Sequence, residues 1–400
     1  MRKIIIAIDS FKGCLTSKEA EQAAANGVKA VFPNCEVICL PVADGGEGMV
    51  EVLVEATDGK MVEVEAHDPL MNLHHTHYGI SGDRTTAFIE MASISGLTLV
   101  PLEQRNPMLT TTYGTGELIR DALEHSCCNF IIGIGGSATN DAGLGMLQAL
   151  GYVLKDKDGK ELGVANGHIM SQVAFIDTDT ANPLLKQARF TVACDVNNPF
   201  YGTQGAAYIY APQKGADEEM VRTLDKGMRH IAGVYQQTTG REISHIPGAG
   251  AAGGMGGCLH AFFNTELKPG IKLILEALNF ADQIKDADLI LTGEGKADQQ
   301  TMMGKVPYGV LEEALKQQIP VILIAGSVCD VNELNKAGFT GVFSITPSPL
   351  SLEQAMLPDF TRSNIQRTVE QIIRITQLRH ADASEKGKCT NKDNFQLISF

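Results

Sequence analysis

The stretch Ile4-Ile5-Ile6-Ala7-Ile8-Asp9, near the start of the chain, decides the class of fold. Its five apolar residues follow one another without polar alternation, which is typical of a strand whose sheet is covered on both faces. A helix is predicted after it, because Thr16 offers an N-cap and alanines and valines recur at helical spacing up to Pro33. A second strand is predicted at residues 37–42 and a second helix at residues 50–56.

The carboxyl-terminal part repeats this alternation. Apolar strands are predicted at residues 288–291, 321–325 and 341–345, with helices at residues 310–315, 331–336 and 365–378. Strands that alternate with helices indicate a parallel sheet. The middle of the chain differs, because residues 62–66 alternate apolar and polar side chains as antiparallel strands do.

The fold class that follows is α/β, with a doubly wound parallel-sheet domain built from both chain ends and an inserted mixed α/β second domain. We place the first domain at residues 1–60 and 286–380 and the inserted domain at residues 61–285. Residues 381–400 are polar and aperiodic, so we expect a flexible tail there.

The composition excludes several classes of protein. The 400 residues are 44% hydrophobic, which excludes a chain that is disordered throughout, and the net charge of −14 argues against nucleic-acid and anionic-membrane partners. No apolar run is long enough to cross a bilayer. The nine cysteines contain no Cys-x-x-Cys pair, so we expect reduced thiols and a cytoplasmic protein.

Glycine-rich turns that carry acids follow four of the predicted strands, at residues 9–13, 44–48, 133–141 and 293–298. Ligands of open α/β sheets bind beyond the carboxyl ends of the strands, so these turns are the candidate site. Gly135-Gly136-Ser137 is expected to precede a helix directly, where bare backbone amides and the helix dipole suit a phosphate. A tight turn without a ligand explains these three residues equally well.

Acids and cations near the turns supply the other groups that phosphoryl transfer needs. Asp195 comes where a predicted strand meets a loop, and Glu294 and Asp298 follow the strand at residues 288–291. The nearby cations are Lys12, Arg105, Lys214, Lys296 and Lys305. Taken alone, each acid is also explained as a helix cap or turn residue, and each lysine as a surface charge.

Other chemistries have weaker signals. Gly133-x-Gly135-x-x-Ala138 and Gly248-x-Gly250-x-x-Gly253 have dinucleotide-binding spacing, but no convincing strand precedes the second. A Walker A motif is absent from the sequence, which argues against a P-loop kinase. Residues His74, His75 and His77 are expected in a solvated hairpin loop rather than in a metal site, because no cysteine or acid stands at ligand spacing.

A series of longer motifs is more specific. In chain order these are IDSFK (8–12), PVADGGEG (41–48), QRNP (104–107), TTYGTGELI (111–119), IGIGGSATND (132–141), ACDV (193–196), PQKGA (212–216), PGAGAAGG (247–254) and LTGEG (291–295). Together they resemble the type 1 glycerate kinases, from about residue 1 to residue 380. The sequence departs from that family at Ala142, where glycine is frequent.

The resemblance implies ATP-dependent phosphorylation of D-glycerate with Mg²⁺, most often to 2-phosphoglycerate, in glycerate, glucarate or glyoxylate catabolism. The residues then expected to bind ATP phosphates are Gly135, Gly136, Ser137, Asn140 and Lys296. The expected catalytic groups are Asp195 and Lys12, with Asp195 either accepting the hydroxyl proton or holding Mg²⁺. The expected substrate ligands are Ser10, Asp44, Glu47 and Arg105, and the expected metal ligands are Glu294 and Asp298.

Three alternatives stay open at this point. The enzyme could phosphorylate the 3-hydroxyl instead, or it could be a nicotinamide-dependent hydroxy-acid oxidoreductase. A non-catalytic protein that binds sugar acids is the third alternative. The sequence also leaves open whether the protein forms a homo-oligomer.

Overall fold

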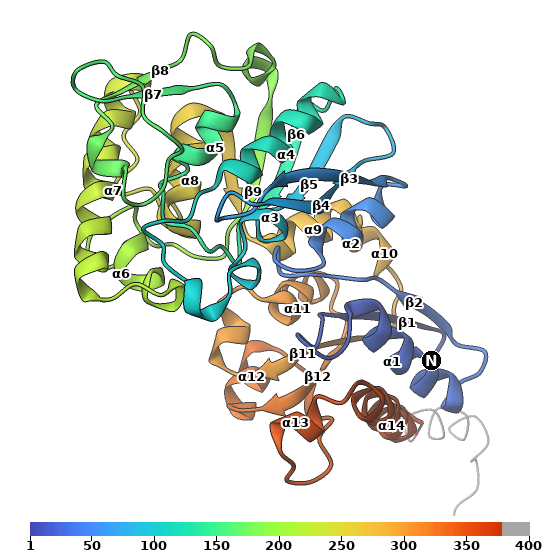
Figure 1. The fold of residues 1–400 in the computed structure, drawn as a ribbon. Coiled ribbons are helices and arrows are strands. Elements are labelled where there is room, and N and C mark those ends of the chain that lie inside the picture. The colour runs from blue at the N-terminus through green and yellow to red at the C-terminus, as the bar shows by residue number, and fades with distance from the viewer. Residues whose placement is uncertain (378–400) are drawn as a thin grey trace, which may run out of the picture. The chain divides into compact units, whose positions relative to one another are not determined.

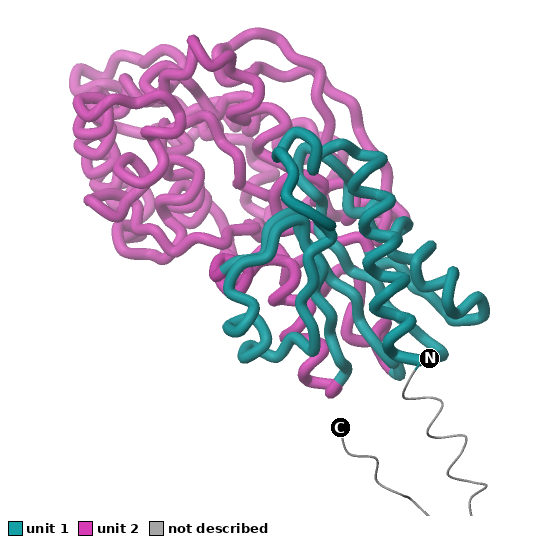
Figure 2. The backbone as a smooth tube through the Cα atoms, turned by 90° about the horizontal axis from the view of Figure 1, so that it is seen from below, with its two compact units in different colours: residues 1–40, 286–298, 319–400 teal, residues 41–285, 299–318 magenta. Residues whose placement is uncertain are grey.

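The computed structural model describes residues 1–377, which form two compact α/β units (Figure 1, Figure 2). Unit 1 contains residues 1–40, 286–298 and 319–377 of the described chain. Unit 2 contains residues 41–285 and 299–318. The tail expected at residues 381–400 lies outside the described residues.

Unit 1 is built on five parallel strands in the order β13-β12-β11-β1-β2. Their bounds are Lys3–Ile8 for β1, Glu36–Cys39 for β2, Leu289–Ala297 for β11, Val321–Val328 for β12 and Gly341–Ser344 for β13. The apolar stretch at the start of the chain is therefore an inner strand, paired with β11 on one side and β2 on the other. The predicted parallel sheet from both chain ends is confirmed.

Helices α1 (Ser17–Val31) and α14 (Pro358–Thr376) lie side by side over this sheet, although they come from opposite ends of the chain (Figure 1). The Thr16 hydroxyl and the Glu19 carboxylate form a capping box that starts α1. A Cβ on Gly27 would lie 2.5 Å from the Gln366 carbonyl oxygen, so glycine allows the two helices to approach. Unit 1 also contains α12 (Val331–Ala337) and α13 (Leu352–Ala355).

Unit 2 is built on a mixed sheet of six strands in the order β10-β9-β6-β5-β4-β3. The bounds are Lys60–His67 for β3, Leu73–Ile80 for β4, Thr86–Glu90 for β5, Asn129–Gly133 for β6, Arg189–Ala193 for β9 and Asn264–Lys268 for β10. Strands β5, β6, β9 and β10 are parallel, whereas β3 and β4 add an antiparallel edge. The expected mixed α/β fold of the middle segment is confirmed.

The remaining elements of unit 2 surround this sheet. Strands β7 (Val153–Lys155) and β8 (Phe175–Asp177) pair as a two-stranded antiparallel ribbon. The helices are α2 (Met49–Ala56), α3 (Ala92–Ser95), α4 (Tyr113–Glu124), α5 (Leu144–Ala149), α6 (Ala206–Tyr210), α7 (Glu218–Thr239), α8 (Ala251–Phe262), α9 (Gly270–Ala277), α10 (Phe280–Gln283) and α11 (Val306–Lys316). None of the helices in residues 1–377 is long and apolar enough to cross a membrane.

Two local features differ from the sequence-based expectation. Helix α2 belongs to unit 2, because it packs on β4 and β5: a Cβ on Gly79 would lie 2.4 Å from the Val54 side chain. Unit 2 accordingly starts at Pro41 rather than at residue 61. The three histidines lie on β4 and not in a loop, with His75 opposite Glu65 of β3, because the hairpin turn falls earlier in the chain.

Candidate active site

The acidic loop at residues 44–48 lies against the carboxyl ends of β6 and β9 in unit 2. A Cβ on Gly133 would lie 2.3 Å from the Gly45 carbonyl oxygen, and one on Gly45 would lie 2.8 Å from Ala193 Cβ. A Cβ on Gly135 would face Gly46 at 3.8 Å from its Cα. The structure therefore brings the loop that carries Asp44 and Glu47 to the glycine turn after β6.

Asp195 lies beside the same loop. Its Oδ1 accepts a hydrogen bond of 3.0 Å from the backbone N–H of Gly270, the first residue of α9. A Cβ on Gly270 would in turn lie 2.2 Å from the Asp44 carbonyl oxygen. Asp195 is exposed, and its hydrogen bond to the first N–H of α9 holds it within reach of the acidic loop.

The glycine turn after β6 does not open a helix, and this expectation was wrong. The chain runs through an irregular segment, residues 134–143, and α5 begins only at Leu144. The reason is Asp141, which accepts four hydrogen bonds and so fixes a non-helical path. Its donors are the Thr112 N–H and hydroxyl at 2.8 Å each, the Gly143 N–H at 3.0 Å and the Gly145 N–H at 3.2 Å.

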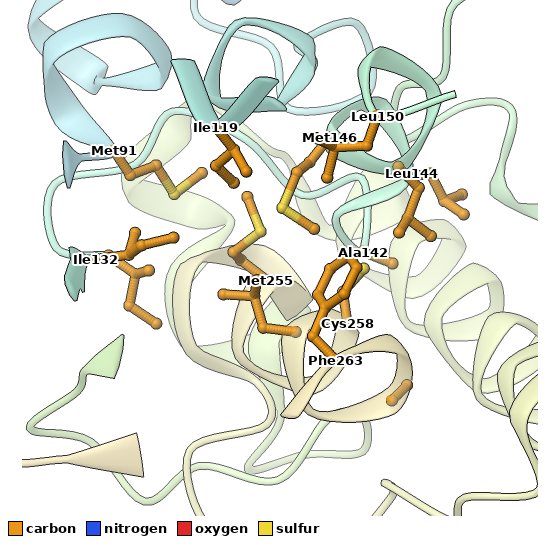
Figure 3. Close-up of a cluster of buried hydrophobic side chains, with 14 of the residues drawn as sticks. Met91, Ile119, Ile132, Ala142, Leu144, Met146, Leu150, Met255, Cys258 and Phe263 are labelled. Carbon is orange, nitrogen blue, oxygen red and sulfur yellow. The ribbon is translucent and has the colours of Figure 1, made fainter. Parts of the chain in front are cut away.

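The segment is tied to the apolar core below it. Ala142 lies with Met255 and Cys258 in the cluster shown in Figure 3. Its φ is +59°, a left-handed conformation that glycine adopts more readily than alanine. This backbone conformation explains why glycine suits the position. Asp141 is fully buried, and burial raises the pKa of its carboxyl group while the four hydrogen bonds act in the opposite direction.

Asn140 is the residue of this segment that lacks the most hydrogen-bond partners. The residue is completely buried, and neither its side-chain nitrogen nor its side-chain oxygen has a hydrogen-bond partner. Leaving a buried polar group without a partner costs about 1–3 kcal/mol, so such groups in a native fold need an explanation. A polar ligand that completes these bonds is one.

Arg105 borders the turn from another side. Its guanidinium donates to the Leu97 and Val100 carbonyl oxygens at 3.4 Å each. Leu97 in turn donates its N–H to the Gly136 carbonyl oxygen at 2.8 Å. Arg105 is therefore connected to the glycine turn through Leu97, and its own hydrogen bonds are to backbone carbonyl oxygens.

Two groups were not assigned a role from the sequence, Lys214, which is buried, and Glu90, which is half-buried. Lys214 donates to the Ser137 hydroxyl and the Thr139 carbonyl oxygen, and Glu90, at the end of β5, accepts a hydrogen bond of 3.0 Å from the Val50 N–H of α2. Burial raises the pKa of Glu90 to about 7 and lowers that of Lys214 to about 7. Both contacts join segments far apart in the chain, so the sequence did not predict them. The one signal in the sequence was the place of Lys214 in the PQKGA motif.

The remaining candidates lie in unit 1, at the carboxyl ends of β1 and β11. Ser10 and Lys12 follow β1, and the Ser10 hydroxyl is buried without a hydrogen-bond partner. Glu294 and Lys296 lie within β11 and not in a turn after it, because pairing with β12 continues as far as Ala297. Glu294 is buried.

Asp298 follows β11 and pairs with Lys296, with 2.9 Å between Oδ2 and Nζ. Within residues 1–377 no group of three or more His, Cys, Asp or Glu side chains is arranged to hold a metal ion. Carboxylate oxygens are nevertheless the ligands that Mg²⁺ prefers, and it usually takes only one or two of them and binds phosphate oxygens as well. Glu294 and Asp298 are chemically suited to that mode.

The second dinucleotide-like pattern has a different role. Gly253 belongs to a left-handed turn at the start of α8, with Ala252 at φ +52° and Gly254 at φ +98°. A Cβ on Gly253 would lie 2.1 Å from the Thr139 carbonyl oxygen. The pattern packs a helix start against the segment that carries Asn140, and no strand directly precedes it in the part of the chain described here.

Both α/β units carry glycine turns and acids at the carboxyl ends of parallel strands, which suits an enzyme that transfers a phosphoryl group. The chain belongs to the glycerate kinase family, whose model matches residues 4–377. Membership of a kinase family implies ATP as the phosphoryl donor.

Individual relatives agree with this family. The chain is 48% identical to glycerate 2-kinase of Escherichia coli over 354 residues, which cover 88% of this chain and 93% of that protein. It is 46% identical to glycerate kinase of Halalkalibacterium halodurans over 357 residues, 89% of this chain and 94% of the relative. A crystal structure from Salmonella typhimurium LT2, provisionally named glycerate kinase 2, has a TM-score of 0.85 and 42% identity, and covers 95% of this chain and 99% of that one.

Proposed function

We propose that the protein transfers the γ-phosphoryl group of ATP to the 2-hydroxyl of D-glycerate and releases 2-phosphoglycerate and ADP. Family membership and the name of the Escherichia coli relative support the activity. The structural observation that carries the proposal is the convergence of the acidic loop, the glycine turn and Asp195 at the ends of β6 and β9. These groups are what phosphoryl transfer to an alcohol requires.

Residues of the turn hold the donor in this proposal. The N–H groups of Gly135, Gly136 and Ser137 and the side chain of Asn140 bind phosphate oxygens. Glycine suits this because no Cβ blocks the approach of a phosphate to the backbone. A phosphate oxygen that accepts from the Asn140 side-chain nitrogen removes the cost of burying that donor unpaired.

Asp195 acts on the acceptor. Its carboxylate accepts the proton of the glycerate hydroxyl as that oxygen forms a bond to the γ-phosphorus and the bond to the β-phosphate oxygen breaks, with ADP as the leaving group. Asp44, Glu47 and Arg105 orient glycerate, with Arg105 the group whose charge suits the substrate carboxylate.

The roles of the unit 1 candidates rest on the family resemblance alone. In this proposal Ser10 supplies a hydroxyl for the substrate, and Lys12 and Lys296 supply positive charge for anionic ligands. Glu294 and Asp298 would hold Mg²⁺, which neutralises phosphate charge when it is bound.

The Asp195→Asn variant tests this assignment. Asparagine keeps an oxygen that accepts from Gly270 N–H, so the start of α9 keeps this hydrogen bond, but the general base is lost. We expect kcat for ADP release with D-glycerate to fall about 10²- to 10⁴-fold, with KM for ATP within twofold. Asp177→Asn, in the ribbon of β7 and β8, is the matched control and should leave kcat unchanged. A kcat near the wild-type value for Asp195→Asn would remove Asp195 from the chemistry.

A further inference from the structure

Lys214 is a buried cation attached to the glycine turn. It is 2% exposed, and its Nζ donates to the Ser137 hydroxyl at 2.9 Å and to the Thr139 carbonyl oxygen at 2.7 Å. The next residue, Gly215, has φ +96°, and a Cβ there would lie 2.1 Å from the Arg105 carbonyl oxygen. The close packing of Gly215 on the Arg105 backbone therefore fixes where the lysine side chain begins.

No carboxylate lies within 4.0 Å of the Lys214 ammonium among the described residues. Asp141 is the acid whose charge acts on it, but that carboxylate already accepts four hydrogen bonds from other donors. A buried charge without a close counter-charge is costly, and this cost lowers the pKa of Lys214 to about 7. A fold that needed only two hydrogen bonds here could use a neutral donor at lower cost.

The segment held by Lys214 is the one that carries the unpartnered Asn140. Lys214 binds Thr139 on one side of Asn140, and Asp141 is clamped on the other. Gly253 packs against the same Thr139 carbonyl oxygen. Contacts from separate parts of the chain therefore preform a segment that holds a buried amide without partners beside a buried cation without a counter-anion. A bound anion with acceptor oxygens would accept from the Asn140 side-chain N–H groups and supply the missing negative charge.

We propose that Lys214 is a positioning residue for the phosphate chain of the nucleotide: it fixes Ser137 and Thr139 and provides the positive charge behind the turn that an anionic polyphosphate requires. The inference rests on the proposed function in taking ATP as the donor. It does not depend on which hydroxy acid is the phosphoryl acceptor. Its consequence is that the charge of Lys214, and not only its hydrogen bonds, contributes to nucleotide affinity.

Binding of a non-hydrolysable ATP analogue without glycerate tests this role. Lys214→Gln keeps a side-chain donor for the turn and removes the charge, and Lys214→Met removes both. Titration calorimetry with adenylyl imidodiphosphate and Mg²⁺ should give a Kd roughly 10- to 100-fold above wild type for Lys214→Gln, the range for a charged hydrogen-bond partner. Binding of AMP, which lacks the β- and γ-phosphates, should change less than twofold.

Lys155→Met is the matched control, because it removes another lysine charge from unit 2, in the ribbon of β7 and β8, and should leave both affinities unchanged. Thermal unfolding without ligand is measured for every variant. Equal weakening of AMP and the analogue would mean that Lys214 is only structural, and an unchanged Kd for the analogue in folded Lys214→Gln would also overturn the proposal. Because Lys214→Gln keeps a donor, the test does not depend on the folding of Lys214→Met.

The outcome separates this inference from the proposed function. If wild-type protein binds the analogue no more tightly than AMP, the phosphate-binding role of the whole turn fails, and the proposal for Lys214 fails with it. If wild type prefers the analogue and Lys214→Gln keeps that preference, only the inference about Lys214 fails. A lack of turnover with D-glycerate leaves the binding comparison intact and counts against the proposed acceptor alone.

Discussion

The Glu90→Gln substitution should change how stability depends on pH. Glu90 lies at the carboxyl end of β5, and its Oε1 accepts from the Val50 N–H in the first turn of α2, the helix that follows the acidic loop. The N-cap of this helix, Gly48, has no side chain to supply an acceptor, so Glu90 does so from another strand. Burial raises the pKa of Glu90 from 4.5 to about 7, the hydrogen bond from Val50 opposes this, and the charge of Glu51 adds to it.

The sign follows from proton binding. Between pH 4.5 and about 7 the folded protein keeps a proton on Glu90 that the unfolded chain has lost, so stability falls as the pH rises through this window. At about 1.4 kcal/mol for each pH unit between the two pKa values, the loss is complete above pH 7 and amounts to about 3 kcal/mol. Glutamine does not titrate, and its carbonyl oxygen can still accept from Val50.

Urea unfolding of wild type and Glu90→Gln at pH 5, 6, 7 and 8 measures the effect. We expect an advantage for the variant of about 1 kcal/mol at pH 5 that grows to about 3 kcal/mol at pH 8. Glu266→Gln, at a mostly exposed carboxylate of β10, is the control and should show a difference below about 0.5 kcal/mol at every pH. A difference between wild type and Glu90→Gln that does not vary with pH would refute the reasoning.

Other substitutions probe the segment around Asn140. Gly253→Ala places a methyl group 2.1 Å from the Thr139 carbonyl oxygen at φ +67°, so we expect a loss of more than about 3 kcal/mol in the free energy of unfolding. Gly233→Ala, in α7 with open space around it, should instead stabilise by about 1 kcal/mol; a similar loss in both variants would contradict the steric argument. Asp141→Asn leaves buried donors without acceptors and should cost about 2–4 kcal/mol by urea unfolding, whereas a change within 0.5 kcal/mol would show that the four hydrogen bonds do not hold the turn.

Much of the fold was predictable because apolar runs and helix caps act locally. The stretch at residues 4–8 became an inner strand, and Thr16 caps α1 as expected. The lengths of elements were less predictable, since β11 continues through Glu294 and Lys296 only because β12 is there to pair with it. Similarly, α2 joins unit 2 through packing on β4 and β5, which its own sequence does not specify.

The approach of the acidic loop to the turn after β6 could be anticipated from the sequence, but the detailed contacts around them could not. Strand-end glycines and acids mark the acidic loop and the turn after β6 in the sequence. The helix expected after Ser137 is missing because Asp141 takes its hydrogen bonds from Thr112, a distant partner. The burial of Lys214 depends on tertiary packing in the same way, so a lysine that looks like a surface charge in the sequence lies inside the protein.

The most direct test of the central claim is ³¹P NMR of the product formed from D-glycerate, ATP and Mg²⁺ by the wild-type protein. The account predicts a 2-phosphoglycerate resonance that grows together with those of ADP. A 3-phosphoglycerate resonance would contradict the proposed acceptor hydroxyl while leaving the kinase class intact. ATP that stays intact, with no new phosphate ester, would contradict the proposed phosphorylation of D-glycerate.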